Sequence, residues 1–234
     1  MINTTPSVSL DQMRKVDQLM VNSYHISLRQ MMENAGNNLA NLVSKLYPNC
    51  ENIVCFAGGG GNGGGTLVAA RHLKVKGYNV SVNLVSKEQN MINESDAELD
   101  TLRHMGVEIR EHHNSWESSD LVIDGMVGYN INGKLKSSLA DLCIKLSNSG
   151  IPIISNDIPS GLHPDKGYID KACIHANQTL TIALPKKGMM GKHLINVVGD
   201  IYLGNISVPA SLYAKLEIAV SEDLFREEDV IPLF

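Results

Sequence analysis

The sequence predicts an α/β protein with a mostly parallel central sheet and helices on both faces of that sheet. Two observations support this fold class. Short apolar segments alternate with helical ones from residue 53 to about residue 158, which is the order that parallel strands and their right-handed crossovers require. A glycine-rich segment also separates the first apolar segment from the helix after it, and in open α/β sheets ligands bind at such strand ends.

Composition narrows the class of protein further. The 234 residues are 43% hydrophobic, which is enough to bury the core of one large α/β domain. Lys plus Arg is 20 and Asp plus Glu is 25, giving a net charge of −5 without any basic run, so a nucleic-acid partner is not expected. Neither a signal peptide nor a membrane-spanning segment is predicted, and the four cysteines form no C-x-x-C pair. We expect a single cytoplasmic domain over residues 1–234.

The N-terminal region is predicted to be helical. Residues 1–9 form a flexible arm that ends in Ser9, a residue able to cap a helix from about Leu10. A second helix is expected from about Ser27 to Leu46. Gly36 in its interior costs roughly 1 kcal/mol relative to Ala, so we expect it to permit close packing.

The segment Gly58–Gly65 is the most unusual part of the chain. Seven of its eight residues are glycine, Asn62 being the exception, and it follows a buried strand, Ile53–Ala57. A helix is predicted to begin after Thr66. Glycine lets the backbone approach a ligand, and a helix N-terminus favours an anion. The spacing G-x-G-x-x-G is present but weakly specific here, and a flexible loop is the alternative.

Further elements follow in alternation. The periodicity predicts strands at residues 78–85, 107–110, 121–124, 152–158, 179–184 and 200–207, helices at 90–105 and 136–146, and a C-terminal capping segment at 211–234. His112 and His113 have no partner at metal-ligand spacing and are interpreted as surface residues.

Two carboxylates occupy strand ends. Asp124 and Asp157 each end a predicted parallel strand, where ligands bind in this fold class. For Asp124 a cap on the following turn is an equally simple interpretation. The glycine segment and these two residues should converge on one edge of the sheet.

Several motifs in a fixed order resemble the YjeF N-terminal domain family. They are MRKVDQLM, MMENAG, the glycine segment with LVAARHLKVKGY, DGMVGYNINGKL, NDIPSGLHPDKG and TLTIALPKKGM. The resemblance implies a Rossmann-like three-layer α/β/α sandwich. It further implies an isomerase, an NAD(P)H-hydrate epimerase, which interconverts the R and S epimers of NADHX and NADPHX in nicotinamide nucleotide repair. A homodimer, a separate NAD(P)H-hydrate dehydratase and K⁺ as cofactor are implied as well. The alternative is a non-catalytic, homodimeric nucleotide-binding or scaffold protein of the same family.

The resemblance also implies site residues. Asp157 is the catalytic residue, and the metal ligands are Asn62, Asp124 and Ser160. The residues expected to bind substrate are Gly61, Asn62, Gly63, Gly64, Gly65, Gly128, Tyr129, Asn130, Ile131, Asn132, Gly133, Lys134 and Asp157. A carboxylate can take and return protons while water is lost and re-added, and a hard monovalent cation prefers amide, carboxylate and hydroxyl oxygens.

The glycine segment departs from the family pattern G-P-G-N-N-G-G-D-G. The positions of the proline, the first asparagine and the aspartate are all glycine here, the last of them Gly65, and the final glycine is Thr66. A carboxylate able to bind ribose hydroxyls is therefore missing. Lys186 and Lys187 are possible phosphate contacts, although solvated surface lysines are the simpler interpretation.

Overall fold

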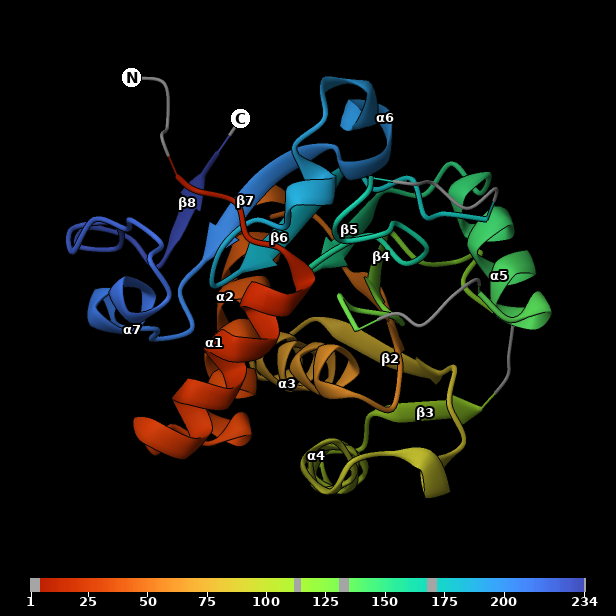
Figure 1. Cartoon of the computed structure of the whole chain (residues 1–234). Coiled ribbons are helices and arrows are strands. Elements are labelled where there is room, and N and C mark those ends of the chain that lie inside the picture. Colours follow the sequence, from red (N-terminus) through yellow and green to blue (C-terminus); the bar gives the residue numbers. More distant parts are fainter. Residues whose placement is uncertain (1–4, 112–114, 131–134, 168–171, 234) are drawn as a thin grey trace.

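An eight-stranded sheet runs through the computed structural model, which describes residues 5–111, 115–130, 135–167 and 172–233 (Figure 1). The strand order is β3-β2-β1-β4-β5-β6-β7-β8. The strands are β1 (Asn52–Ala57), β2 (Asn79–Leu84), β3 (Glu108–Glu111), β4 (Leu121–Gly125), β5 (Ile153–Asn156), β6 (Gln178–Ile182), β7 (Asp200–Gly204) and β8 (Val230–Pro232). Every neighbouring pair is parallel except β7–β8, so the predicted fold class is confirmed.

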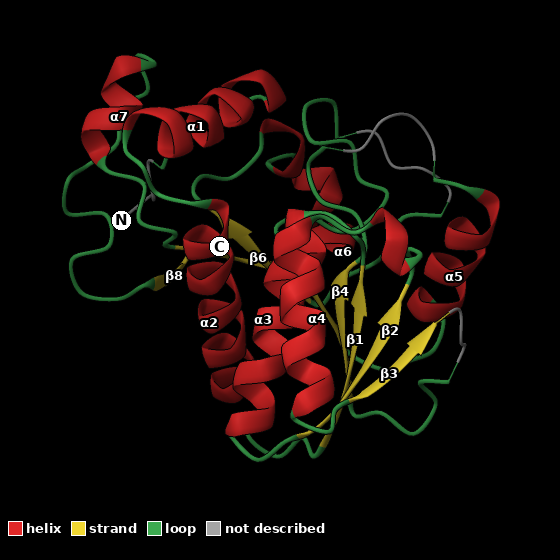
Figure 2. Cartoon of the chain, turned by 90° about the horizontal axis from the view of Figure 1, so that it is seen from below, coloured by secondary structure: helices red, strands yellow, loops and turns green. Residues whose placement is uncertain are grey.

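Helices cover both faces of this sheet. They are α1 (Leu10–Ser23), α2 (Leu28–Leu46), α3 (Gly61–Val75), α4 (Asn93–His104), α5 (Ser137–Ser147), α6 (Ile195–Val198) and α7 (Ala210–Lys215). Figure 2 shows α2, α3 and α4 side by side on one face and α5 on the other, which is the expected three-layer sandwich. Short 3₁₀ turns lie at Glu88–Asn90, Lys187–Met189 and Lys192–Leu194.

The central strand β1 explains why the sheet is buried on both sides. Ile53 and Cys55 pack into the core beneath α2, α3 and α4, while Val54 and Phe56 pack into the core beneath α5. Successive side chains of a strand point to opposite faces, so an unbroken apolar run serves both layers. Strand β1 lies between β2 and β4 and pairs with both in parallel.

Close packing of α2 against α3 depends on glycine, as the sequence predicts. A Cβ atom at Gly36 would lie 2.5 Å from the side chain of Val68 and 2.6 Å from the carbonyl oxygen of Gly65. The two helix backbones therefore approach each other more closely than any larger residue at position 36 would allow. This contact fixes the position of the N-terminal turn of α3.

The strand order reverses at β1, whose two neighbours are β2 and β4. In open α/β sheets the crevice at such a reversal binds ligands, because the connections on its two sides run to opposite faces. Helix α1 lies beyond the carboxyl ends of these strands (Figure 2). It begins with a capping box in which Ser9 and Gln12 bond each other's backbone.

The two ends of the described chain are held against the body of the protein. Within the predicted arm, Val8 is fully buried and its N–H donates to the carbonyl of Pro185 over 2.9 Å. Strand β8, within the predicted capping segment, pairs with the edge strand β7. Among the described residues, no helix is both long and apolar enough to cross a membrane.

Candidate functional site

A cavity of about 720 Å³ opens at the carboxyl ends of β1, β4 and β5. Its walls come from α1 and α2 on one side and from the strand ends on the other. The residues that line it include Gly59–Gly63, Ser86, Met126–Asn130, Asn156, Asp157 and, from the helices, Met13, Asp17, Gln18, Leu28, Met31 and Met32. The cavity is large enough for a ligand of nucleotide size.

The glycine segment begins a helix, which corrects the expectation that the helix starts after Thr66. Helix α3 begins at Gly61, with Gly60 as its N-cap. The lack of room for side chains explains why this turn consists of glycine. A Cβ at Gly63 would lie 1.8 Å from the carbonyl oxygen of Gly58, and one at Gly64 would lie 2.1 Å from Met32. The first turn therefore has almost no side chains of its own, and it lines the cavity, which places a helix N-terminus where an anion could bind.

Asp124 sits behind this turn in a fully buried hydrogen-bond network. Its carboxylate accepts from the Ser160 hydroxyl over 2.6 Å, the Ser160 N–H over 2.9 Å and the Ser155 hydroxyl over 2.9 Å. The Met126 N–H adds a fourth bond of 3.2 Å. Burial raises the pKa of Asp124 above its ordinary value of 3.8, and the bonds from Ser160 and Ser155 partly offset that rise. Asp124 thus braces the following turn through the Met126 N–H, which agrees with the interpretation as a cap, while its role at a ligand site stays a prediction.

Asn62 has a side chain that the described residues leave unsatisfied. Both atoms of its amide group are buried without a hydrogen-bond partner in the described part of the chain. The side chain packs against Gly128, where a Cβ would lie 2.8 Å from Asn62 Cβ. Its backbone carbonyl accepts from Asn156 Nδ2 over 3.1 Å. A buried amide without a partner carries a cost of about 1–3 kcal/mol, so a ligand for it is expected.

Asp157 adopts an unusual backbone conformation at the end of β5. Its φ angle is 67°, and its side chain is buried in an ion pair with Lys186. Lys186 is fully buried and also donates to the carbonyl of Ile182 over 3.0 Å. The interpretation of Lys186 as a solvated surface lysine was therefore wrong, because a buried ammonium group needs a charged partner and Asp157 supplies it. A positive φ at a buried residue other than glycine indicates strain retained by its surroundings.

Several polar residues of this cavity were not predicted from the sequence, among them Gln18, Asn22, Ser86 and Asn156. The acidic residue among those not predicted is Asp17. It lies on α1, and its carboxylate accepts a hydrogen bond from the hydroxyl of Tyr129, which itself was predicted to bind substrate. Burial raises the pKa of Asp17 above its ordinary value of 3.8. The sequence does hint at Asp17, because this acidic residue lies among the apolar residues Met13, Val16 and Met20 of the helix. All three of these apolar residues are buried.

The predicted site residues divide into three groups. Those that line the cavity are Gly61, Asn62, Gly63, Gly128, Tyr129, Asn130 and Asp157. Asp124 and Ser160 lie buried behind the cavity wall, and Gly64 and Gly65 are buried in α3. Ile131, Asn132, Gly133 and Lys134, like His112 and His113, lie outside the described residues.

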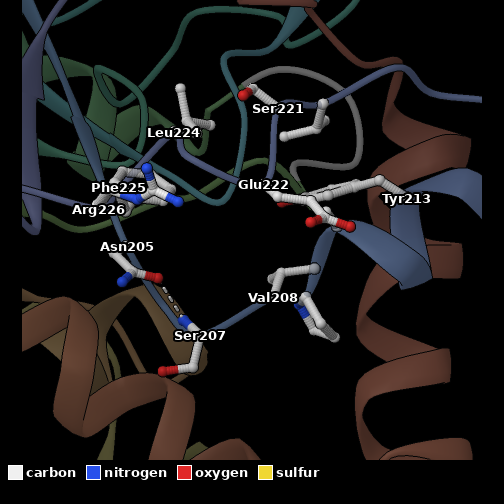
Figure 3. A pocket seen from close by; sticks show the side chains of 12 residues that line it. Asn205, Ser207, Val208, Tyr213, Ser221, Glu222, Leu224, Phe225 and Arg226 are labelled. Carbon is white, nitrogen blue, oxygen red and sulfur yellow. Dashed lines mark hydrogen bonds between the residues drawn. The ribbon is translucent and has the colours of Figure 1, made fainter.

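A second, smaller cavity of about 290 Å³ lies away from this site (Figure 3). It is lined by the segment after β7, including Asn205 and Ser207, by Tyr213 of α7 and by residues 220–226 of the C-terminal segment. None of the site residues predicted from the sequence lines this smaller cavity. The larger cavity is therefore the candidate active site.

Comparison with known proteins agrees with this geometry. A chain from Dehalogenimonas lykanthroporepellens, named NAD(P)H-hydrate epimerase, is 32% identical over 89% of this chain and 84% of its own length. A protein of the same name from Entamoeba histolytica is 28% identical over 94% of this chain and 96% of its own. The crystal structure of yeast ynu0 superposes with a TM-score of 0.84 at 23% identity, covering 97% of this chain and 100% of that one.

The family assignment follows from these matches together. The fold is shared with the yeast structure, and the sequence model described as YjeF-related protein N-terminus matches residues 28–188, the stretch from the start of α2 to the turn after Lys186. That stretch contains the glycine turn, Asp124, Asp157 and Ser160. The chain belongs to the family of the YjeF-related protein N-terminus.

Proposed function

We propose that this protein is an NAD(P)H-hydrate epimerase, an isomerase that interconverts the R and S epimers of NADHX and NADPHX. The observation that carries the proposal is the convergence of a side-chain-free helix N-terminus, Asn62 and Asp157 on one cavity of nucleotide size. The names of its relatives support the same activity. The non-catalytic alternative is not favoured by these names.

Within this proposal the first turn of α3 binds the pyrophosphate of the substrate. Its free N–H groups and the positive end of the helix dipole favour an anion there, and Gly60 leaves open space beside it, since a Cβ at that position would meet nothing within 4 Å. The apolar walls formed by Met13, Met31 and Met32 suit the uncharged rings of a nucleotide.

A potassium ion fits the residues behind this turn. Asn62 offers a buried amide oxygen without a partner in the described chain, and the buried Asp124 carboxylate has no ion pair with any described residue. Asn62, Asp124 and Ser160 would hold the ion through oxygen atoms, as a hard cation requires. When bound, it would supply positive charge that offsets the charges of Asp124 and of the substrate's pyrophosphate.

Asp157 is the residue we assign to proton transfer. Epimerisation requires the C–O bond at the hydroxylated ring carbon to break and re-form on the other face, so a proton must reach the departing oxygen and another must leave the incoming water. A carboxylate at the cavity wall can carry out such a transfer. Lys186 orients the Asp157 carboxylate through their ion pair. A cytoplasmic homodimer acting with a separate dehydratase completes the proposal.

The decisive experiment is an epimerisation assay on the purified protein in the presence of potassium. Pure R-NADHX is supplied, and the appearance of the S epimer is followed against the spontaneous rate in a matched sample without protein. Acceleration is expected. A folded protein that binds NADH but leaves the spontaneous rate unchanged would contradict the proposal and favour a binding role.

A further inference from the structure

Among the described residues, two carboxylates face the candidate active site. Asp157 comes from the end of β5, and Asp17 comes from α1, the helix that lies beyond the strand ends. Asp17 is bonded to the hydroxyl of Tyr129, and all three residues line the same cavity. On α1, by contrast, Asp11 is exposed and forms an ion pair with Arg14 over 3.8 Å. Asp17 is thus the carboxylate of this helix that is placed for chemistry.

The buried ammonium group of Lys186 lies near both carboxylates. Lys186 forms its ion pair with Asp157, and its Nζ lies 5.8 Å from the centre of the Tyr129 ring, whose hydroxyl is bonded to Asp17. Asp157 therefore has a direct cationic partner, whereas Asp17 has a phenol. Burial and the nearby Asp157 raise the pKa of Asp17, while Tyr129 and Lys186 oppose the rise. Such unequal environments are typical of carboxyl pairs with different roles in proton transfer.

Epimerisation needs proton transfer on both faces of the ring. On the first face the hydroxyl oxygen takes a proton, the C–O bond breaks with its electron pair on oxygen, and water leaves while the lone pair of the ring nitrogen stabilises the carbon. On the second face a water oxygen bonds to that carbon, the lone pair returns to nitrogen, and a proton is released. The protons balance, and no oxidant or reductant is consumed. A single carboxyl fixed by an ion pair can serve one face of a bound ring only.

We propose that Asp17 is a second catalytic residue of the epimerase site, transferring the proton on the ring face that Asp157 does not serve, with Tyr129 as the residue that positions it. This assignment rests on the proposed function. It also gives α1 a direct role in the chemistry in addition to closing the cavity.

The test uses Asp17→Asn, which keeps the size of the side chain, with Asp11→Asn as the matched control on the same helix. Epimerisation is measured starting from each pure epimer. In the same samples, uptake of ¹⁸O from labelled water is measured in the hydroxyl group of the starting epimer, which reports exchange with retention of configuration. We expect Asp17→Asn to slow epimerisation about 100-fold or more, a loss typical of a missing general acid or base. One epimer should still exchange its oxygen, because the Asp157 face remains competent. Asp11→Asn should match the wild type.

Exchange without inversion distinguishes a catalytic role from a structural one. Unchanged epimerisation in Asp17→Asn, or equal loss of epimerisation and of exchange at both epimers, would overturn the role of Asp17. Tyr129→Phe provides a second variant if Asp17→Asn fails to fold, and it should slow epimerisation while keeping exchange at the same single epimer. Failure of the wild-type protein to epimerise at all would instead overturn the proposed function.

Discussion

At the scale of single residues, the site contains a buried ion pair between Asp157 and Lys186. Asp157 and Lys186 are both almost inaccessible to solvent, at 2% and 0% exposure. A buried ion pair adds little net stability, but removal of one partner is costly because the other charge remains buried alone. The pair is therefore better explained by the orientation of Asp157 toward the cavity than by stability.

Asp157→Asn is expected to abolish epimerisation and also to destabilise the fold by about 3–5 kcal/mol, since Lys186 then keeps an uncompensated charge. The backbone itself should tolerate the change, because asparagine accepts the φ of 67° at this position. The double variant Asp157→Asn/Lys186→Met should recover most of the stability without activity. Urea unfolding and the epimerisation assay check the two effects separately, and unchanged turnover in Asp157→Asn would remove its catalytic role.

Residue-scale packing also surrounds Gly65, the position of the missing aspartate. A Cβ at Gly65 would lie 3.3 Å from Asn156 Nδ2, a tight contact that requires the Asn156 side chain to shift, and 3.7 Å from Ala35 Cβ, an ordinary van der Waals distance. Gly65 is buried in α3 beside α2 rather than at the cavity wall. A side chain at position 65 would therefore act on the packing between these helices and on Asn156, which itself lines the cavity.

At the scale of elements, three helices are joined by a polar cluster on their outer side. Arg71 of α3 pairs with Glu33 of α2 and with Glu98 of α4, and Glu33 also contacts His72. Burial raises the pKa of Glu33, but the bonds from Arg71 and His72 outweigh it, so the pKa lies below its ordinary value of 4.5. The cluster links the helix that carries the glycine turn to both of its neighbours.

This cluster should make stability depend on pH. Because the folded-state pKa of Glu33 is lowered, its contribution is present above pH 4.5 and is lost as pH falls through the folded-state pKa. We expect Arg71→Gln to lower the free energy of unfolding at pH 7 and to make its decline below pH 4.5 shallower. Since Glu33 is 44% exposed, solvent screening limits its share to roughly 1 kcal/mol or less.

Urea unfolding between pH 3 and pH 7 measures this dependence. Arg226→Gln is the control, because its pair with Asp223 is exposed at 72% and 57%. Parallel pH profiles for Arg71→Gln and the wild type would show that the cluster contributes nothing to acid stability.

At the scale of the whole molecule, the candidate ion site joins three strands of the sheet. Asn62 follows β1, Asp124 ends β4 and Ser160 follows β5, so an ion held between them would tie these strand ends together. A ligand that binds only the folded state raises its stability by mass action.

Potassium should therefore raise the melting temperature compared with an equal concentration of tetramethylammonium, which is too bulky for the site. At about 100 times the dissociation constant, the gain is about 2.7 kcal/mol. Asn62→Ala should lose this response, whereas Asn49→Ala, an exposed residue in the turn before β1, should keep it. Thermal unfolding in both salts is the measurement, and equal melting temperatures for the wild type would count against the ion site.

The sequence by itself determined the fold class, the order of the elements and three of the converging groups. Apolar runs such as Ile53–Ala57 are local signals, and the carboxyl ends of parallel strands must meet at one edge, so Asp124 and Asp157 could be placed there without a structure. The helix start at Gly61, the burial of Lys186 and the position of Asp17 could not be obtained in this way. Each depends on tertiary contacts: Gly63 packs against Gly58 and Gly64 against Met32 of α2, Lys186 pairs with Asp157, and α1 lies against the strand ends. Local sequence specifies periodicity, but only tertiary packing decides which polar groups are brought out of water together.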